Sequence, residues 1–236
     1  EKAFSEFSPK AVIITNIYGQ SANYKILLDI CKKYKTPVVE DAAESLGAEY
    51  LGKKCGSFGD ISILSFNGNK IITTSGGGMI LSNNKSFLEK ANKLSNQSKE
   101  NKIHYEHKEI GYNYRMSNIL AALGVGQFSS LDYFVDRKRS IFNEYKSNFT
   151  YCKEVEPMPE IKNGKSTNWL SVFLIKNKSY DEIKKMIYFF SKKNIEFRPV
   201  WKPMHMQPLY KECKFYHTRK KPVSEHLFNH GLCFPS

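Results

Sequence analysis

Long apolar segments are missing from this sequence of 236 residues. No stretch reaches the roughly 18 consecutive apolar residues that a membrane-spanning helix requires. The first residues, Glu1–Glu6, are rich in charge and contain no apolar core of the kind that a signal peptide carries. We therefore expect a cytoplasmic protein without membrane contact.

Paired cysteines are also missing. None of the five cysteines forms a CxxC pair with another, and they are Cys31, Cys55, Cys152, Cys213 and Cys233. An odd number at these spacings argues against a disulfide scaffold and against a zinc site. This use of cysteine is typical of a reducing compartment.

The charge is strongly basic but is spread along the chain. The formal net charge is +13, while 41% of the residues are hydrophobic and 25% are charged, as in ordinary globular proteins. The basic residues are mostly scattered lysines, and we find neither a helix-turn-helix nor an arginine-rich segment. Solvated helix faces explain this pattern, and a phosphorylated substrate is compatible with it. A basic DNA-binding regulator is the non-enzymatic alternative, but we expect no nucleic-acid partner.

The first half of the chain alternates apolar strands with amphipathic helices. A strand, a helix and a second strand within about 30 residues are typical of a parallel βαβ unit. One further strand precedes the glycine run Gly76–Gly78 and another begins within it. The long helix of this half begins after Ser117, because serine favours the N-cap position of a helix. The predicted strands are 11–15, 37–41, 61–66 and 78–82, and the predicted helices are 24–34, 86–95 and 119–145.

The second half forms a smaller module. Composition changes at about Phe149, and the pattern then predicts a strand over 169–176, an amphipathic helix over 179–193 and a strand over 195–198. We expect two domains, residues 1–130 and residues 131–236. The chain starts in a helix-like segment and stops at a strand-to-loop transition without a closing helix, so we expect it to be cut from a larger protein.

Lys70 lies in a short polar loop after an apolar strand and before Gly76–Gly78. A lysine buried near a strand end is costly unless it is paired or used chemically. Lysine forms Schiff bases because its amine becomes nucleophilic when its pKa is lowered. Lys70 is therefore either a lysine that holds an aldehyde cofactor or an ordinary surface lysine in a turn.

Two polar residues follow other strands and fit the first of these alternatives. Asp41 ends a strand, and in open α/β sheets ligands bind at the carboxyl ends of strands. A carboxylate there can pair with the pyridinium nitrogen of pyridoxal phosphate, or it can cap a helix that starts at Ala42-Ala43. Ser65 can donate to a phosphate. The segment Thr73–Gly78 is either a phosphate cradle or a flexible turn, and it does not match the Walker pattern GxxxxGK[ST].

Histidines raise two further possibilities. His104 and His107 are spaced to share one helical face, but no third ligand is near them in the sequence, so we expect no metal site. His205 follows Trp201 closely, and this indole can stack on a substrate ring or pack in a core. Site and core remain open for this pair.

The order of the motifs resembles the DegT/DnrJ/EryC1/StrS family of pyridoxal-phosphate sugar aminotransferases over nearly the whole chain. The sequence around Lys70, together with the segments His104–His107 and Trp201–His205, is most similar to members that act on UDP-linked 4-keto-6-deoxy N-acetyl sugars. The products of those members lead to bacillosamine, which serves protein glycosylation. The motifs are Asp41-Ala-Ala-Glu44, Gly56-Ser-Phe-Gly-Asp60, Ser65-Phe-Asn-Gly-Asn-Lys70, Gly76-Gly-Gly-Met79, Gly111-Tyr-Asn-Tyr-Arg-Met-Ser-Asn118 and Leu232-Cys-Phe-Pro-Ser236.

This resemblance implies a fold and a cofactor. The fold would be an α/β fold, PLP fold type I (aspartate aminotransferase-like), with part of the large domain and its mostly parallel sheet in residues 1–130 and a truncated α+β small domain in residues 131–236. Lys70 would carry pyridoxal 5′-phosphate and move protons at the sugar C4. Asp41 would pair with the pyridine nitrogen, and Glu44, where many members have Gln, would lie near the phenolic oxygen. Ser65 would bind the cofactor phosphate.

The resemblance also implies partners. Asn113 would reach the phosphate of a neighbouring subunit, which makes a homodimer with shared active sites. Arg115, Trp201 and His205 would contact the nucleotide sugar. Glutamate would donate the amino group, and a nucleotide-diphosphate 4-keto sugar would accept it.

The chain departs from the family in length. Members are longer, and the missing N-terminal part would carry a phosphate-binding turn, a ring that stacks on the cofactor and several strands. An inactive fragment of such an enzyme is therefore one alternative. A cofactor-dependent sugar dehydratase is another, although such enzymes replace the lysine with His and this chain has Lys70.

Overall fold

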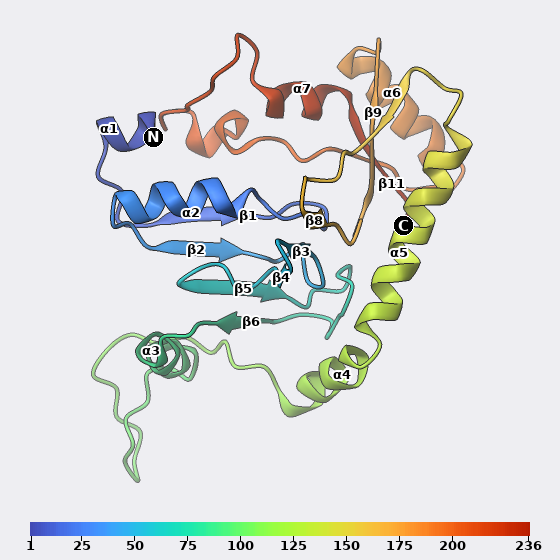
Figure 1. Cartoon of the computed structure of the whole chain (residues 1–236). Coiled ribbons are helices and arrows are strands. Elements are labelled where there is room, and N and C mark those ends of the chain that lie inside the picture. The colour runs from blue at the N-terminus through green and yellow to red at the C-terminus, as the bar shows by residue number, and fades with distance from the viewer. The chain divides into compact units, whose positions relative to one another are not determined.

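A computed structural model describes residues 1–236 as two compact units (Figure 1). The large unit contains Pro9–Asp136 and Ile161–Thr167, and the small unit contains Glu1–Ser8, Arg137–Glu160 and Asn168–Ser236. None of the helices is both long enough and apolar enough to cross a membrane.

The large unit is built on a four-stranded sheet in the order β1-β2-β5-β6, whose strands lie side by side in Figure 1. β1 (Val12–Thr15) pairs in parallel with β2 (Val38–Asp41), and β2 pairs in parallel with β5 (Ile61–Ser65). β6 (Gly78–Leu81) runs antiparallel to β5. The predicted βαβ unit is confirmed, because α2 (Tyr24–Lys33) connects β1 to β2.

Side-chain caps set the beginnings of the helices in this unit. The Asn23 side chain accepts a hydrogen bond from the Ile26 N–H at the start of α2, and Asn84 does the same for Ser86 at the start of α3 (Lys85–Ser95). Each cap satisfies a backbone donor that a first helical turn leaves without a partner. The predicted helices 24–34 and 86–95 are confirmed within one residue at each end.

The predicted single helix over 119–145 is wrong. Two helices occupy this segment, α4 (Asn118–Phe128) and α5 (Leu131–Asn148), and Ser129-Ser130 separates them. Ser117 caps α4 as expected, since its Oγ accepts a bond from the Leu120 N–H. Serine competes for backbone hydrogen bonds and disfavours a helix interior, which explains the break.

A small antiparallel sheet completes the large unit. Its order is β4-β3-β8, with β3 (Glu49–Tyr50), β4 (Lys53–Lys54) and β8 (Gly164–Lys165). Ala42, Ala48 and Cys55, which lie between β2 and β5 in the sequence, form a buried cluster.

The small unit is an antiparallel sheet with helices. Its sheet has the order β10-β11-β9-β7, and its helical elements are α1, α6, α7, most of α5 and two short 3-10 helices, η1 and η2. Apolar side chains of α5, α6, β9 and β11 form its core. The bounds are α1 (Lys2–Glu6), β7 (Val155–Pro157), β9 (Ser171–Ile175), α6 (Tyr180–Ser191), β10 (Arg198–Pro199), η1 (Met204–Met206), η2 (Pro208–Tyr210), α7 (Val223–His230) and β11 (Gly231–Phe234).

Two predictions for this unit have different outcomes. The helix predicted over 179–193 is confirmed as α6, and Ser179 and Glu182 form a reciprocal capping box at its start. The strand predicted over 195–198 is wrong, because residues 195–197 are irregular and only Arg198–Pro199 pairs with β11. The apolar side chain of Phe197 packs against the core from this irregular segment, which explains the strand-like pattern.

Candidate active site

The carboxyl ends of three strands meet at one edge of the large unit's sheet. β1, β2 and β5 are parallel and end at Thr15, Asp41 and Ser65, so these residues share that edge. β6 begins opposite Ser65, at Gly78, so the loop between them lies at the same edge. This loop carries Lys70, and ligands of open α/β sheets bind at such an edge.

The amine of Lys70 lies beside carboxylates and is withdrawn from water. Its side chain is 13% exposed, and its Nζ is 3.9 Å from Oε1 of Glu44. Burial lowers the pKa of Lys70, while the negative charges of Glu44 and Asp41 oppose that shift. Lowering the pKa of a lysine increases the neutral, nucleophilic fraction of its amine. Lys70 is therefore not an exposed surface lysine.

Glu44 is held by a tight turn that follows β1. The backbone N–H of Tyr18 donates to Oε2 of Glu44 at 2.9 Å. Tyr18 and Gly19 have φ values of 56° and 89°, and Ile17 and Gln20 exchange backbone hydrogen bonds around them. Positive φ at both central residues is typical of a type I′ turn, and it is unfavourable for a bulky residue such as tyrosine. A strained backbone therefore orients the donor that fixes Glu44.

Asp41 and Ser65 each accept a hydrogen bond from the backbone two residues later in the chain. Oδ1 of Asp41 accepts from the Ala43 N–H at 3.1 Å, and Oγ of Ser65 accepts from the Asn67 N–H at 3.4 Å. Residues 42–47 form turns and not a helix, so the alternative that Asp41 caps a helix is wrong. An ionised carboxylate accepts several hydrogen bonds, so Asp41 has capacity for a further partner.

The loop after Lys70 is closely packed. The N–H groups of Phe66 and Thr74 donate to backbone carbonyls within the loop at 3.0 and 2.9 Å. Gly77 has a φ of 91°, and a Cβ at Gly78 would lie 2.4 Å from the carbonyl oxygen of Leu64. The absence of a side chain at Gly78 therefore allows the backbones of β5 and β6 to approach closely. A phosphate-binding role for this loop stays a prediction.

A buried carboxylate beneath the site escaped the sequence reasoning. Glu40, next to Asp41 on β2, is fully buried. Its two oxygens accept five hydrogen bonds, which come from Asn16 Nδ2, Ser62 Oγ and the N–H groups of Gly56, Phe58 and Gly59. A glutamate directly after two valines in the strand was the signal that could have identified it, since a buried carboxyl group requires partners.

The remaining predicted residues make contacts of their own. Asn113 pairs with Asn96 in an isolated β-bridge, and Arg115 donates to Oδ1 of Asn96 at 3.4 Å. Trp201 and His205 belong to the small unit. The ring of His205 stacks on Phe215 with centroids 3.6 Å apart, and its Nε2 lies 2.9 Å from Oε1 of Glu225. The substrate and subunit roles of these four residues stay predictions.

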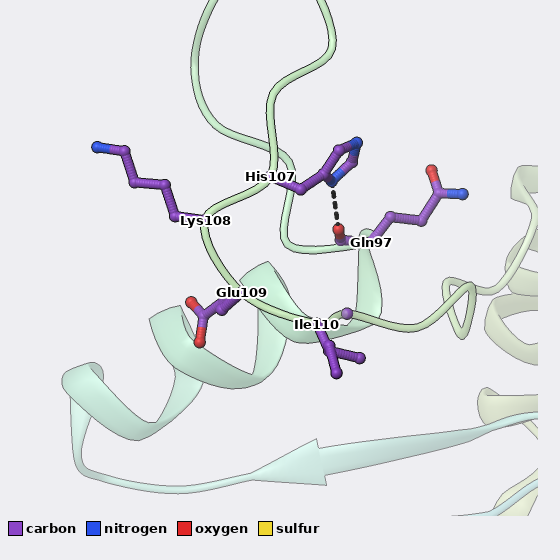
Figure 2. Close-up of a pocket in the computed structure, with 6 residues that line it drawn as sticks. Gln97, His107, Lys108, Glu109 and Ile110 are labelled. Carbon is purple, nitrogen blue, oxygen red and sulfur yellow. Dashed lines mark hydrogen bonds between the residues drawn. The ribbon is translucent and has the colours of Figure 1, made fainter.

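The segment that contains His104 and His107 is not helical, so the two histidines do not share a helical face. His107 instead donates through Nδ1 to the Gln97 carbonyl at 2.8 Å, as Figure 2 shows. Around it, residues Gln97 and His107–Gly111 line an open pocket of about 540 Å³. Neither Lys70 nor Asp41, Glu44 or Ser65 lines this pocket. No group of three or more His, Cys, Asp or Glu residues in the chain is placed to hold a metal ion.

Comparisons with known proteins identify the family. The model of the DegT/DnrJ/EryC1/StrS aminotransferase family matches residues 1–236. The chain is 48% identical over 231 residues to the Bacillus subtilis protein named "Putative pyridoxal phosphate-dependent aminotransferase EpsN", and the match covers 97% of this chain and 58% of that protein. It is 37% identical over 227 residues to GDP-perosamine synthase of Escherichia coli O157:H7, covering 96% of this chain and 60% of the relative.

A solved structure agrees with these relatives. Helicobacter pylori PseC, an aminotransferase involved in the biosynthesis of pseudoaminic acid, superimposes with a TM-score of 0.86 at 27% identity, covering 96% of this chain and 61% of PseC. The chain thus spans about three fifths of the length of these relatives, and the predicted PLP fold type I is confirmed for this part. The chain belongs to the DegT/DnrJ/EryC1/StrS aminotransferase family.

Proposed function

We propose that this protein is a pyridoxal-phosphate-dependent aminotransferase that transfers an amino group from glutamate to a nucleotide-linked 4-keto-6-deoxy sugar at C4. The observation that carries the proposal is the placement of Lys70, which is largely buried beside Glu44 at the carboxyl edge of the sheet. An amine in these surroundings is suited to form an imine with an aldehyde cofactor.

The donor set at this edge fits pyridoxal phosphate. Lys70 offers an amine for the aldehyde, and Asp41 offers a carboxylate for the pyridinium nitrogen. Glu44 would lie near the phenolic oxygen, and Ser65 would donate to the phosphate. When bound, the cofactor supplies an electron sink for the carbon that carries the amino group. Lys70 would then move the proton to and from the sugar C4.

The second subunit and the substrate side are further parts of the proposal. Asn113 would reach the phosphate of a partner's cofactor in a homodimer, and Arg115, Trp201 and His205 would contact the nucleotide sugar. The apolar helix α4 supports a homodimer, since none of its residues is buried. We also propose that residues 1–130 form part of the cofactor-binding domain and residues 131–236 the small domain of a cytoplasmic enzyme.

The sugar substrate can be linked to UDP or to GDP. The motifs around Lys70 resemble members that use a UDP-linked N-acetyl sugar and lead to bacillosamine, so we favour UDP. One of the relatives is named a GDP-perosamine synthase, and another, from Campylobacter jejuni, is named a UDP-4-amino-4,6-dideoxy-N-acetyl-beta-L-altrosamine transaminase. Turnover of matched UDP-linked and GDP-linked 4-keto-6-deoxy sugars with glutamate decides between them.

The cofactor test uses the purified chain. Incubation with pyridoxal phosphate is expected to give the absorbance band of an imine. Borohydride should reduce this imine and leave the cofactor covalently attached to the peptide that contains Lys70. Lys70→Ala should lose this label, and Lys85→Ala, which removes an exposed lysine of α3, should keep it. Equal labelling of Lys70→Ala would show that Lys70 does not carry the cofactor.

The same assay separates the alternatives. Cofactor binding without turnover by this chain supports the inactive-fragment alternative, because the relatives are longer. Loss of water from the sugar without uptake of an amino group supports the dehydratase. A salt-sensitive shift of DNA without cofactor binding supports the regulator.

A further inference from the structure

Glu40 and Glu44 are connected by an unbroken series of contacts. Oε1 of Glu40 accepts from Nδ2 of Asn16 at 3.0 Å, and Asn16 immediately precedes the turn that contains Tyr18. The backbone N–H of Tyr18 then donates to Glu44, whose other oxygen is 3.9 Å from Nζ of Lys70. A fully buried carboxyl group is thus joined to the candidate catalytic amine through one residue and one turn.

The side chain of Asn16 contacts both Glu40 and the loop that follows Asn16. Its Oδ1 accepts from the Ala22 N–H at 2.9 Å and from the Tyr24 hydroxyl at 2.8 Å, and its Nδ2 also donates to Ser45 Oγ at 3.0 Å. Because only its oxygen can accept from the Ala22 N–H and only its nitrogen can donate to Glu40, these two partners together set the orientation of the Asn16 amide. The loop between Asn16 and Tyr24 closes around this side chain.

The turn itself needs external support. A positive φ at Tyr18 is costly, and such a conformation persists only where its surroundings fix it. The carbonyl of Gly19 accepts from the Thr167 N–H at 2.9 Å and from Ser166 Oγ at 3.1 Å, and Oε1 of Gln20 accepts from the Ile161 N–H at 2.7 Å. Segment 161–167 therefore supports the turn at Gly19 and Gln20. Asn16, which contacts Glu40, binds Ala22 and Tyr24 just after the turn.

We propose that Glu40 is a positioning residue that, through Asn16 and the Tyr18–Gly19 turn, holds Glu44 beside the amine of Lys70. This inference deepens the proposed function, since it concerns the lysine that would carry the cofactor. It requires the carboxyl group at position 40, because the amide of a Glu40→Gln variant has only one oxygen and would turn its NH2 group toward some of the donors. Asp41 and Glu44 are the charged groups that act on Lys70, and Tyr24 and Cys55 are the titratable groups that adjoin Glu40.

The test measures the titration of Lys70 in cofactor-free protein, by acetylation with acetic anhydride over a range of pH and mass spectrometry of the Lys70 peptide. The midpoint of the rate against pH reports the charge on the amine, and the plateau at high pH reports its accessibility. Glu44→Gln removes a unit charge 3.9 Å from the amine while keeping an acceptor for Tyr18. It should lower the midpoint by about 0.8 pH unit or more, the effect of that distance in a water-like medium.

Glu40→Gln should lower the midpoint in the same direction, and the double variant should titrate no lower than Glu44→Gln alone, because both changes remove the same contact. Val38→Ala is the matched control, since Val38 is buried on the same strand without a side-chain hydrogen bond. It should change stability but leave the midpoint unchanged. If Glu40→Gln fails to fold, Asn16→Ala breaks the same connection while four donors remain on Glu40, and it must lower the midpoint too.

Two results would overturn the proposal. One is a Glu40→Gln or Asn16→Ala protein that is folded and has the wild-type midpoint. The other is an additive shift in the double variant, which would mean that Glu40 acts directly and not through Glu44. Because the labelling requires no cofactor, either result is distinct from a failure of the proposed aminotransferase function.

Discussion

The side-chain amide of Gln127 forms two hydrogen bonds with the backbone of Thr73. Its Oε1 accepts from the Thr73 N–H at 3.1 Å, and its Nε2 donates to the Thr73 carbonyl at 2.6 Å. Gln127 lies in the last turn of α4, and Thr73 lies in the loop that carries Lys70. The helix therefore holds the candidate cofactor loop in place through one side chain.

Replacing Gln127 tests this connection. Gln127→Glu keeps the shape and one acceptor but cannot donate to the Thr73 carbonyl, and it faces that oxygen with a negative charge. The variant loses one hydrogen bond and leaves the Thr73 carbonyl without its donor, so we expect a loss of about 1–3 kcal/mol in the free energy of unfolding. Urea unfolding measures it, and weaker pyridoxal phosphate binding should accompany it.

The matched control is Gln97→Glu, the same chemical change at an exposed residue of the large unit. It should change the free energy of unfolding by less than about 0.5 kcal/mol. Equal effects of the two variants would show that the added charge, and not the contact with Thr73, is responsible.

The glycines after Lys70 provide a second test, because they differ in the space around them. A Cβ at Gly78 would lie 2.4 Å from the Leu64 carbonyl oxygen, whereas a Cβ at Gly76 would meet nothing within 4 Å. Gly78→Ala should therefore lose about 1–3 kcal/mol or more in the free energy of unfolding, because the β5–β6 pair must separate. Gly76→Ala should be neutral or stabilise by up to about 1 kcal/mol. Similar melting temperatures for the two variants would contradict this account of the turn.

The site was predictable where it depends on strand order. Asp41 and Ser65 end parallel strands that are neighbours in the sheet, and such strands bring their carboxyl ends to one edge. The strand–helix–strand pattern predicted only the pairing of β1 with β2, because no helix connects β2 to β5. Lys70 follows Ser65 by a short loop that must stay at that edge. The family motifs then gave these residues their expected chemistry.

Other features depend on contacts between distant residues and had no local signal. Glu40 receives its hydrogen bonds from Asn16, which follows β1, from Ser62 of β5 and from the Gly56–Gly59 turn, and only the folded sheet brings these together. The positive φ of Tyr18 contradicts the preference of its residue type and is imposed by the surrounding turn. The same holds for Phe197, whose apolar pattern predicted a strand although the residue packs on the core without pairing.

Cys55 allows a prediction about pH. Burial raises the pKa of its thiol from 9.0 to about 12. The folded state therefore binds this proton more tightly than the unfolded state, so its contribution to stability is complete below pH 9 and is lost as the pH rises toward 12. At pH 9 iodoacetamide should alkylate the exposed Cys213 rapidly and leave Cys55 unmodified. Peptide mass spectrometry measures both, and urea should make Cys55 reactive; rapid alkylation of Cys55 in the folded protein would contradict its burial.

The proposed homodimer can be tested on α4. This helix is apolar around its circumference, yet none of its residues is buried, and Ile119 and Val125 are 77% and 74% exposed. Apolar side chains gathered on a surface mark an interaction site, and burying one such side chain stabilises an interface by about 1.5–3 kcal/mol. We therefore expect the wild-type chain to elute as a dimer in size-exclusion chromatography with light scattering, and Val125→Asp to shift it toward the monomer.

Tyr188→Asp is the control, because Tyr188 is 63% exposed on α6 of the small unit. A Val125→Asp protein that remains dimeric at low micromolar concentration would place the interface elsewhere, and dissociation of both variants would show that the added charge acts on stability and not at α4.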